Sequence, residues 1–198
     1  MFKIFRSAVL AGFTVGLAAF GYLCIGGVPG AVVFAFGLLT VVAYKLSLFT
    51  GTVGFIKKDE VPSLLLILVG NVIGCLVVSL MTRVSANDLQ SAAQQIIQSR
   101  MDNGALRSGI LAIGCGFIMT TAVTFARKGN VLPLLFGVPL FIFCGFPHCL
   151  VDAFYCQTVP FSFFKENAPE ILATYGCVVL GNFVGCNLFR IVMPDATL

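Results

Sequence analysis

Charge is the scarcest property of this sequence. Asp, Glu, Lys and Arg make up 10% of its 198 residues, whereas hydrophobic residues make up 59%. A soluble domain of this length needs a charged surface, so the composition excludes an ordinary soluble fold. It predicts instead one integral membrane domain over residues 1–198. The net charge of +4 is small and lies in short loops, so we expect no nucleic-acid partner.

Tryptophan is absent and histidine occurs once. Without Trp, the Tyr, Phe, Lys and Arg side chains must anchor the chain at the membrane surfaces. The eight cysteines lie inside or at the end of apolar runs, and no C-x-x-C pattern occurs. We interpret them as small buried hydrophobic residues rather than as disulfides or metal ligands. With no second histidine and no nucleophile–base set, we expect neither a cofactor nor an enzyme.

Six apolar runs fill most of the chain, each close to the 20 residues that a membrane helix needs. They are continuously apolar rather than alternating, which excludes a closed β-barrel. The first run resembles a signal peptide, but the next begins within a few residues, so we expect a membrane span. The sequence therefore predicts an all-α membrane protein with six spans, at residues 8–25, 28–49, 61–82, 106–126, 131–156 and 171–193.

The basic residues predict the orientation of these spans. With the N-terminus placed inside, eight basic residues fall on the inner side and four on the outer side. The positive-inside rule then places both termini in the cytoplasm of a bacterial-type inner (plasma) membrane. The inner residues are Lys3, Arg6, Lys45, Lys57, Lys58, Arg127, Lys128 and Arg190, and the outer ones are Arg83, Arg100, Arg107 and Lys165.

The longest polar stretch, residues 83–105, has signals of its own. Residues 85–88 (SAND) are typical of a helix start and residues 102–104 (DNG) of a helix end. The stretch is either a short polar helix over the outer mouth or a solvated linker.

An internal repeat links the third run to the sixth. Residues 70–75 (GNVIGC) recur as residues 181–186 (GNFVGC), with four identities in six. Three spans per half force the two halves, about 1–103 and 104–198, into opposite orientations. Such inverted repeats place a solute pathway at their interface. Glycines four residues apart also allow close helix packing, which is the alternative explanation for these glycines.

The second run ends in an unusual segment, residues 45–54 (KLSLFTGTVG), which carries a lysine, three hydroxyls and two glycines. Such a stretch can break a helix, which is tolerated at membrane depth only where protein or water satisfies the backbone. The fifth run contains Gly145 and Pro147 just before His148. We therefore expect breaks at matching positions of the two halves, which point to a solute path.

His148 is the best candidate for chemistry, and Asp152 lies four residues later, on the same face of a helix. Ionisable groups inside a membrane span usually face a cavity or one another. Histidine can exchange a proton with a weak acid near neutral pH. The alternative is a buried His–Asp pair that only holds two helices together.

These elements together resemble the formate/nitrite transporter family. The resemblance rests on LFTGT at residues 48–52, on GFPHC at residues 145–149 with Asp152, and on the two Gly-Asn-x-x-Gly elements. It covers nearly the whole chain. It implies an aquaporin-like six-helix fold with broken second and fifth helices, a homopentamer with one pore per subunit, and passage of small monovalent anions such as formate, nitrite, lactate or hydrosulfide.

The resemblance also implies roles and shows departures. His148 corresponds to the central pore histidine, and Thr50 would hydrogen-bond near it or near the solute. Asp152 stands where the family usually has asparagine, Pro147 where glutamate is common, and Lys45 where glycine is usual. An ionised Asp152 would repel an anion, so it is protonated, or pairs with His148 or Lys45, or the substrate is not the usual anion.

The resulting hypothesis is a proton-linked channel or transporter. Lys45 inside and Arg107 outside attract an anion. A constriction of Leu48, Phe49 and Phe146 excludes bare ions, because desolvating a charge is expensive. The anion then gains a proton linked to His148 and crosses as a neutral acid. The rivals are a channel for ammonia, urea or water, and a membrane scaffold without transport.

Overall fold

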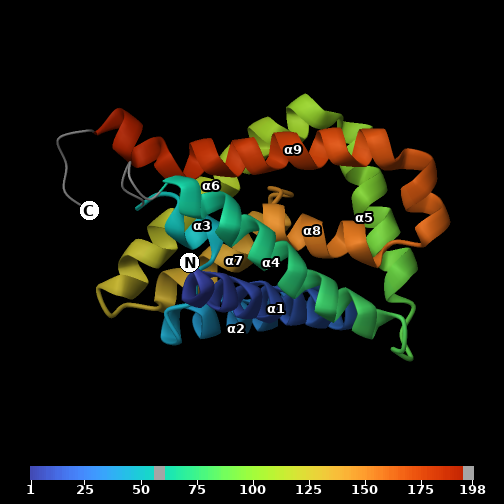
Figure 1. The fold of residues 1–198 in the computed structure, drawn as a ribbon, viewed down its shortest axis with the longest axis horizontal. Coiled ribbons are helices and arrows are strands. Elements are labelled where there is room, and N and C mark those ends of the chain that lie inside the picture. The colour runs from blue at the N-terminus through green and yellow to red at the C-terminus, as the bar shows by residue number, and fades with distance from the viewer. Residues whose placement is uncertain (56–60, 194–198) are drawn as a thin grey trace.

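The protein is described by a computed structural model over residues 1–55 and 61–193, and these residues form nine helices and no strand (Figure 1). The predicted all-α class is therefore confirmed. Lys57 and Lys58, which supported the predicted orientation, lie outside the described residues. The helices are α1 (Phe2–Ile25), α2 (Gly27–Ala43), α3 (Phe49–Thr52), α4 (Val61–Thr82), α5 (Leu89–Asn103), α6 (Ala105–Arg127), α7 (Leu132–Phe143), α8 (Cys149–Thr158) and α9 (Phe161–Val192).

Four of these helices, α1, α4, α6 and α9, are long and apolar enough to cross a membrane by length and composition. Helices α2 and α7 are apolar but shorter. Each lies where the sequence predicted a longer span, and each is followed, after a gap of five residues, by a short helix, α3 or α8.

The two gaps have the same backbone design. Lys45, the second residue after the end of α2, has φ 53°, and its counterpart after α7, Gly145, has φ 68°. The next backbone N–H groups reach back by matching bonds, from Leu46 to Val41 O and from Phe146 to Phe141 O. Extended residues, Leu48 and His148, then start α3 and α8.

The closest helix pairs are α1 with α4 and α6 with α9, and glycines make them possible. A Cβ atom on Gly74 would lie 2.0 Å from the carbonyl oxygen of Val9 in α1. A Cβ atom on Gly185 would lie 2.0 Å from the carbonyl oxygen of Ile113 in α6. The glycines of the repeated hexapeptide therefore do serve close packing, in the same way in both pairs.

One predicted boundary is wrong, and the two alternatives for residues 83–105 are now distinguished. Helix α9 begins at Phe161, so the polar segment around Lys165 is helical rather than a loop, because it contains no glycine and its only internal proline, Pro169, does not break the helix. Helix α5 begins at Leu89, and its N-cap is Asp88, whose side chain accepts a hydrogen bond from the N–H of Ser91 at 3.1 Å. A solvated linker over residues 83–105 is therefore excluded.

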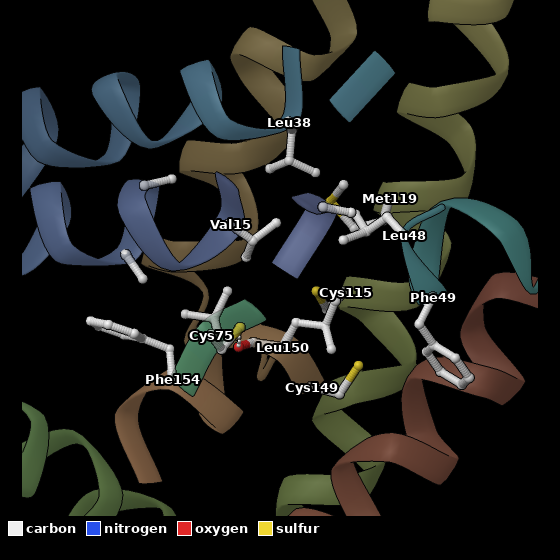
Figure 2. Close-up of a cluster of buried hydrophobic side chains, with 14 of the residues drawn as sticks. Val15, Leu38, Leu48, Phe49, Cys75, Cys115, Met119, Cys149, Leu150 and Phe154 are labelled. Atoms are coloured by element: carbon white, nitrogen blue, oxygen red, sulfur yellow. Dashed lines mark hydrogen bonds between the residues drawn. The ribbon is translucent and has the colours of Figure 1, made fainter. Parts of the chain in front are cut away.

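The helices give the molecule two distinct ends. In Figure 1 the start of α1, the end of α9 and the short helix α3 lie toward the left, and α5 lies at the right. The buried side chains between these ends form one apolar cluster, part of which Figure 2 shows.

Candidate functional site

His148 lies in the gap between α7 and α8, where its extended backbone makes it the N-cap of α8. The side chain is buried, and its Nδ1 accepts a hydrogen bond from the backbone N–H of Leu150 at 3.3 Å. An imidazole nitrogen that accepts carries no proton, so the neutral ring has its proton on Nε2. The local backbone therefore sets the tautomer of the ring.

Nε2 of His148 lies 3.0 Å from Oγ1 of Thr50, the second residue of α3. Thr50 is fully buried. With the proton on Nε2, the imidazole donates to the hydroxyl oxygen of Thr50. The two short helices, one from each half of the chain, thus meet through this single side-chain contact. The predicted proximity of Thr50 and His148 is present in the structure.

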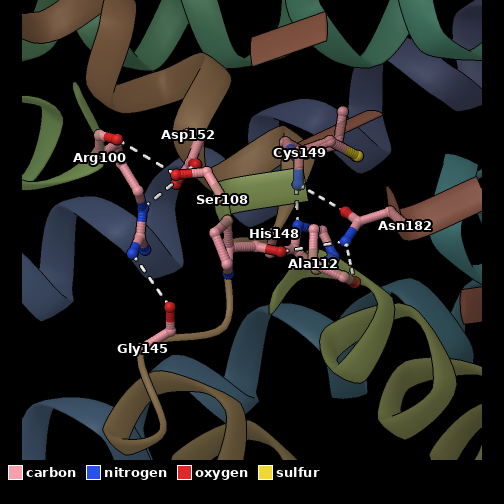
Figure 3. A network of polar contacts seen from close by, with 10 residues as sticks. Arg100, Ser108, Ala112, Gly145, His148, Cys149, Asp152 and Asn182 are labelled. Atoms are coloured by element: carbon pink, nitrogen blue, oxygen red, sulfur yellow. Dashed lines mark hydrogen bonds and ion pairs between the residues drawn. The ribbon is translucent and has the colours of Figure 1, made fainter. Parts of the chain in front are cut away.

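Two buried asparagines hold the gaps that carry these residues. Asn182 accepts from the N–H of Cys149 at 2.7 Å and donates to the carbonyls of Ala112 at 2.8 Å and Pro147 at 3.0 Å. Figure 3 shows this arrangement beside His148. The amide thereby satisfies backbone groups that the interrupted helix leaves open, as membrane burial demands.

Asn71 does the same for the other gap. It accepts from the N–H of Phe49 at 2.9 Å and donates to the carbonyls of Ala8 at 2.7 Å and Ser47 at 2.9 Å. In both copies of the repeated Gly-Asn element, glycine thus permits close helix contact and asparagine holds a connection between two helices. The repeat could be seen in the sequence, but we predicted no role for its asparagines.

A cavity of about 290 Å³ opens beside His148 on the side of α5, and we call it the α5 cavity. Its lining includes the aromatic side chain of Phe146. The polar residues of its lining are Tyr22, Gln95, Ser99, Arg100, His148, Asp152 and Tyr155. It therefore connects the histidine with the end of the molecule where α5 lies.

Arg100 is the cation of the α5 cavity. Its Nε lies 3.4 Å from Oδ2 of Asp152, and one of its terminal nitrogens donates to the carbonyl of Gly145 at 3.0 Å (Figure 3). Asp152 therefore pairs with Arg100, a partner that was not among the alternatives we raised from the sequence, which were a protonated Asp152, a pair with His148 or Lys45, or an unusual substrate. Only the docking of α5 onto α8 brings this arginine close. Arg107, the predicted outer cation, is exposed and does not line the cavity.

A second cavity, of about 510 Å³, lies on the side of α3, and we call it the α3 cavity. Lys45 and Arg127 supply its positive charge, and Leu48 supplies part of its apolar wall. Among the residues that the structure describes, none that lines this cavity is acidic. The guanidinium of Arg127 lies 3.8 Å from the ring centroid of Phe55 and donates to the carbonyl of Gly51 at 3.3 Å. Arg127 is thus held at the end of α3.

The three residues of the predicted constriction do not line one common cavity. Phe146 lines the α5 cavity and Leu48 lines the α3 cavity, while Phe49 lines neither. Figure 2 shows the Phe49 ring extending from α3 in a direction different from that of Leu48. The aromatic residue against the histidine is Phe141, whose ring is stacked at 5.8 Å and 30° from that of His148.

Arg100 and Phe141 are the functional candidates that the sequence analysis missed. Arg100 carried a weak signal, because it is a cation in the polar stretch next to a predicted pore mouth. Phe141 carried none, since it is one of 20 phenylalanines in an apolar run.

The chain was compared with known families, sequences and structures. The family model described as "Formate/nitrite transporter" matches residues 1–194. The comparison with curated protein sequences gives no match. A solved structure described as "Pentameric formate channel with formate bound" is similar at 24% identity and a TM-score of 0.81, covering 96% of this chain and 94% of that one.

A second solved structure, described as "FNT family ion channel", is similar at 18% identity and a TM-score of 0.86. The similarity covers 100% of this chain and 91% of that one. At these identities the two structures establish a shared fold, and the family model covers nearly all of the sequence. The chain therefore belongs to the formate/nitrite transporter family, a family of integral membrane transport proteins rather than enzymes.

Proposed function

We propose that this protein passes a small monovalent anion, or its conjugate weak acid, across a bacterial-type inner membrane. Formate, nitrite and hydrosulfide are the candidate solutes. The observation that carries the proposal is the His148–Thr50 contact, which lies between two cavities that are each lined by a basic side chain. A titratable group between two such cavities suits a solute that arrives charged and crosses neutral.

The membrane arrangement is part of the proposal. One domain spans the membrane six times as a 3+3 inverted repeat, in which α2 with α3 and α7 with α8 are the two broken spans. The matching bonds of Asn71 and Asn182 support this pairing of halves. Both termini are cytoplasmic, since the start of α1 and the end of α9 lie at the α3 end with Lys45 and Arg127 (Figure 1).

The mechanism begins in the vestibules. Lys45 and Arg127 raise the anion concentration in the α3 cavity, whereas Arg100 in the α5 cavity is paired with Asp152 and gives the anion hydrogen-bond donors rather than net charge. Between the cavities, Leu48 and Phe141 present apolar surface, where a bare ion would lose its hydration at high cost. The anion takes up a proton linked directly or indirectly to His148 and crosses as a neutral acid. Transport is then electroneutral and increases as the pH falls.

The subunits assemble as a homopentamer with one pathway in each. The similar solved channel is described as pentameric. Large hydrophobic side chains are exposed along the bundle, for example Leu65, Phe36 and Leu180. Such surfaces suit contact with lipid and with neighbouring subunits. Native mass spectrometry of the purified protein tests the subunit number.

A second candidate is a channel for a neutral solute such as ammonia, urea or water. The observation that favours it is the Arg100–Asp152 ion pair, which cancels the charge of the only cation in the lining of the α5 cavity. A vestibule without net charge attracts anions poorly. Osmotic swelling of proteoliposomes in neutral solutes separates this candidate from the first.

The deciding experiment is uptake of formate, nitrite and hydrosulfide into proteoliposomes at two pH values. Uptake of at least one anion that rises at acid pH, and that loses this rise in His148→Phe, supports the proposal. Absence of flux for all three, together with swelling in a neutral solute, establishes the second candidate instead.

A further inference from the structure

A third cavity lies on the other side of the Arg100–Asp152 pair, and His148 does not line it. It is lined by residues of α5, α8 and α9, and its volume is about 10 Å³. Four of its lining residues are polar, namely Arg100, Asp152, Thr174 and Tyr175. The rest of its wall is Ile97, Met101, Cys156 and Ile171. We call it the α9 cavity, because Thr174 and Tyr175 belong to that helix.

Unpaired polar atoms gather around this cavity. In the described part of the chain, six buried side-chain nitrogen and oxygen atoms make no hydrogen bond, and four of them belong to residues of the α9 cavity. Three of them, Asp152 Oδ1, Thr174 Oγ1 and Tyr175 OH, have no partner among the described residues, and the fourth, Arg100 Nε, faces Asp152 Oδ2 at 3.4 Å in the ion pair. Asp152 and Thr174 are 3% and 4% exposed. Each buried polar atom left unpaired costs about 1–3 kcal/mol, so such a cluster calls for a shared partner.

Size and chemistry define that partner. A cavity of roughly 10–15 Å³ is the least that accommodates a water molecule, so the α9 cavity holds one at most and excludes formate or nitrite. The carboxylate oxygen of Asp152 disfavours an anion, and the guanidinium of Arg100 disfavours a cation. The two hydroxyls can donate or accept. Only a neutral ligand that both donates and accepts fits this set.

We infer that the α9 cavity binds one ordered water molecule, which links Thr174 and Tyr175 of α9 to the carboxylate of Asp152. The water donates to Asp152 Oδ1 and accepts from a hydroxyl of α9, while Oδ2 faces Arg100. Both oxygens of the Asp152 carboxylate then have a partner, the water at Oδ1 and Arg100 at Oδ2. Thr174 and Tyr175 thereby act as positioning residues for the ion pair that lines the α5 cavity, although neither lines that cavity itself.

The inference is tested on the full-length protein in lipid nanodiscs, by electron cryomicroscopy at a resolution that shows water. We expect one density within hydrogen-bond distance of Asp152 Oδ1, Thr174 Oγ1 and Tyr175 OH. The double variant Thr174→Val, Tyr175→Phe keeps the side-chain shapes and should lose the density. Thr174→Ser keeps the hydroxyl and should retain it.

A measurement in solution uses Met101 as a reporter, because this buried thioether lines the same cavity. Hydroxyl radicals formed from bound water by a short X-ray pulse oxidise methionine next to that water. Oxidation of Met101 should fall severalfold in Thr174→Val and return to the wild-type level in Thr174→Ser.

Three results would overturn the inference. The first is a direct hydrogen bond from Tyr175 or Thr174 to Asp152 with no density between them. The second is density or Met101 oxidation that persists unchanged in the double variant. The third is a density that strengthens as bromide is added, which would identify an anion. None of these measurements depends on transport, so they are independent of the proposed function.

Discussion

The guanidinium of Arg100 lies between the carboxylate of Asp152 and the carbonyl of Gly145, with Nε 3.4 Å from Asp152 Oδ2. One side chain of α5 thus contacts both ends of the segment that carries His148. The same contact sets the charge of the α5 cavity, because a cation and an anion cancel at this point. The charge of the α5 cavity and the position of the segment that carries His148 therefore both depend on Arg100.

Neutralising Asp152 and neutralising Arg100 should change the rate of anion uptake in opposite directions. Asp152→Asn leaves Arg100 uncompensated, so initial uptake of a permeant anion should rise. Arg100→Gln leaves the carboxylate uncompensated, so uptake should fall. We expect each change to be about tenfold, the factor that corresponds to ~1.4 kcal/mol. The measurement is the initial rate of uptake into proteoliposomes at low ionic strength.

The double variant Arg100→Gln, Asp152→Asn is the control for this charge argument. It restores neutrality and should bring uptake back toward the wild-type rate. The differences among variants should also shrink in high salt, because ions screen the vestibule charge. Equal rates in all four proteins at low salt would show that the pair does not control anion entry.

His148→Phe should abolish the pH dependence of uptake. The substitution removes the group that we propose to exchange a proton with the solute, while the ring still packs on Phe141. The wild-type rate should rise as the pH falls, and the variant should give a flat profile between about pH 5 and pH 8, the range in which histidine titrates. A variant profile parallel to that of the wild type would exclude the histidine from the proton step.

Thr50→Val is a companion to this test, because it removes the hydroxyl that His148 contacts and keeps the shape of the side chain. If the proton passes through Thr50, this variant should also lose most of the pH-dependent component. If the imidazole acts on the solute directly, the pH profile should keep its form and only the rate should change.

The positions of the long apolar helices could be predicted from the sequence, and the contacts around the site could not. Residues 61–82 were predicted as a span and form α4 with the same bounds, since an apolar run of that length has few alternatives in a membrane. The gap before His148 was also predictable, because Gly145 and Pro147 interrupt an apolar run. The partner of Asp152 depends on how α5 docks against α8, which no local pattern records.

The roles of Asn71 and Asn182 illustrate a signal that was present but not used. A carboxamide in the middle of an apolar span is expensive unless it is hydrogen-bonded. An asparagine occurs at the equivalent position of both repeats, which indicated two equivalent backbone segments that need hydrogen-bond partners. We used the glycines of the repeat to predict helix packing. The asparagines between them stabilise the connections that lead into α3 and α8.

Lys45→Gly should make the protein more stable and a poorer anion transporter. Lys45 has φ 53°, a left-handed conformation that costs a residue with a side chain about 1–2 kcal/mol relative to glycine. It also supplies one of the two cations of the α3 cavity. The free energy of unfolding should therefore rise by about 1 kcal/mol, while anion uptake at low salt falls. Lys45→Gln is the control, since it should lose uptake without gaining stability.

Asn182→Leu should destabilise the protein strongly. It leaves the N–H of Cys149 and the carbonyl of Pro147 without their partner, and each buried unpaired group costs about 1–3 kcal/mol. Asn187→Leu is a matched control on the same helix, because that side chain is only partly buried and donates to the carbonyl of Phe183 within its own helix. Thermal unfolding of the two purified variants should differ clearly. Similar melting temperatures would contradict the supporting role of Asn182.

Replacing each of two glycines of α9 by alanine should change the stability of the protein in opposite directions. A Cβ atom on Gly185 would lie 2.0 Å from the carbonyl oxygen of Ile113, whereas one on Gly176 would meet nothing within 4 Å. Gly185→Ala must therefore push α9 away from α6, at a cost of about 1–3 kcal/mol. Gly176→Ala adds a better helix former in open space and should gain up to about 1 kcal/mol. Thermal unfolding measures both, and a Gly185→Ala variant as stable as the wild type would show that these helices approach less closely than the structure indicates.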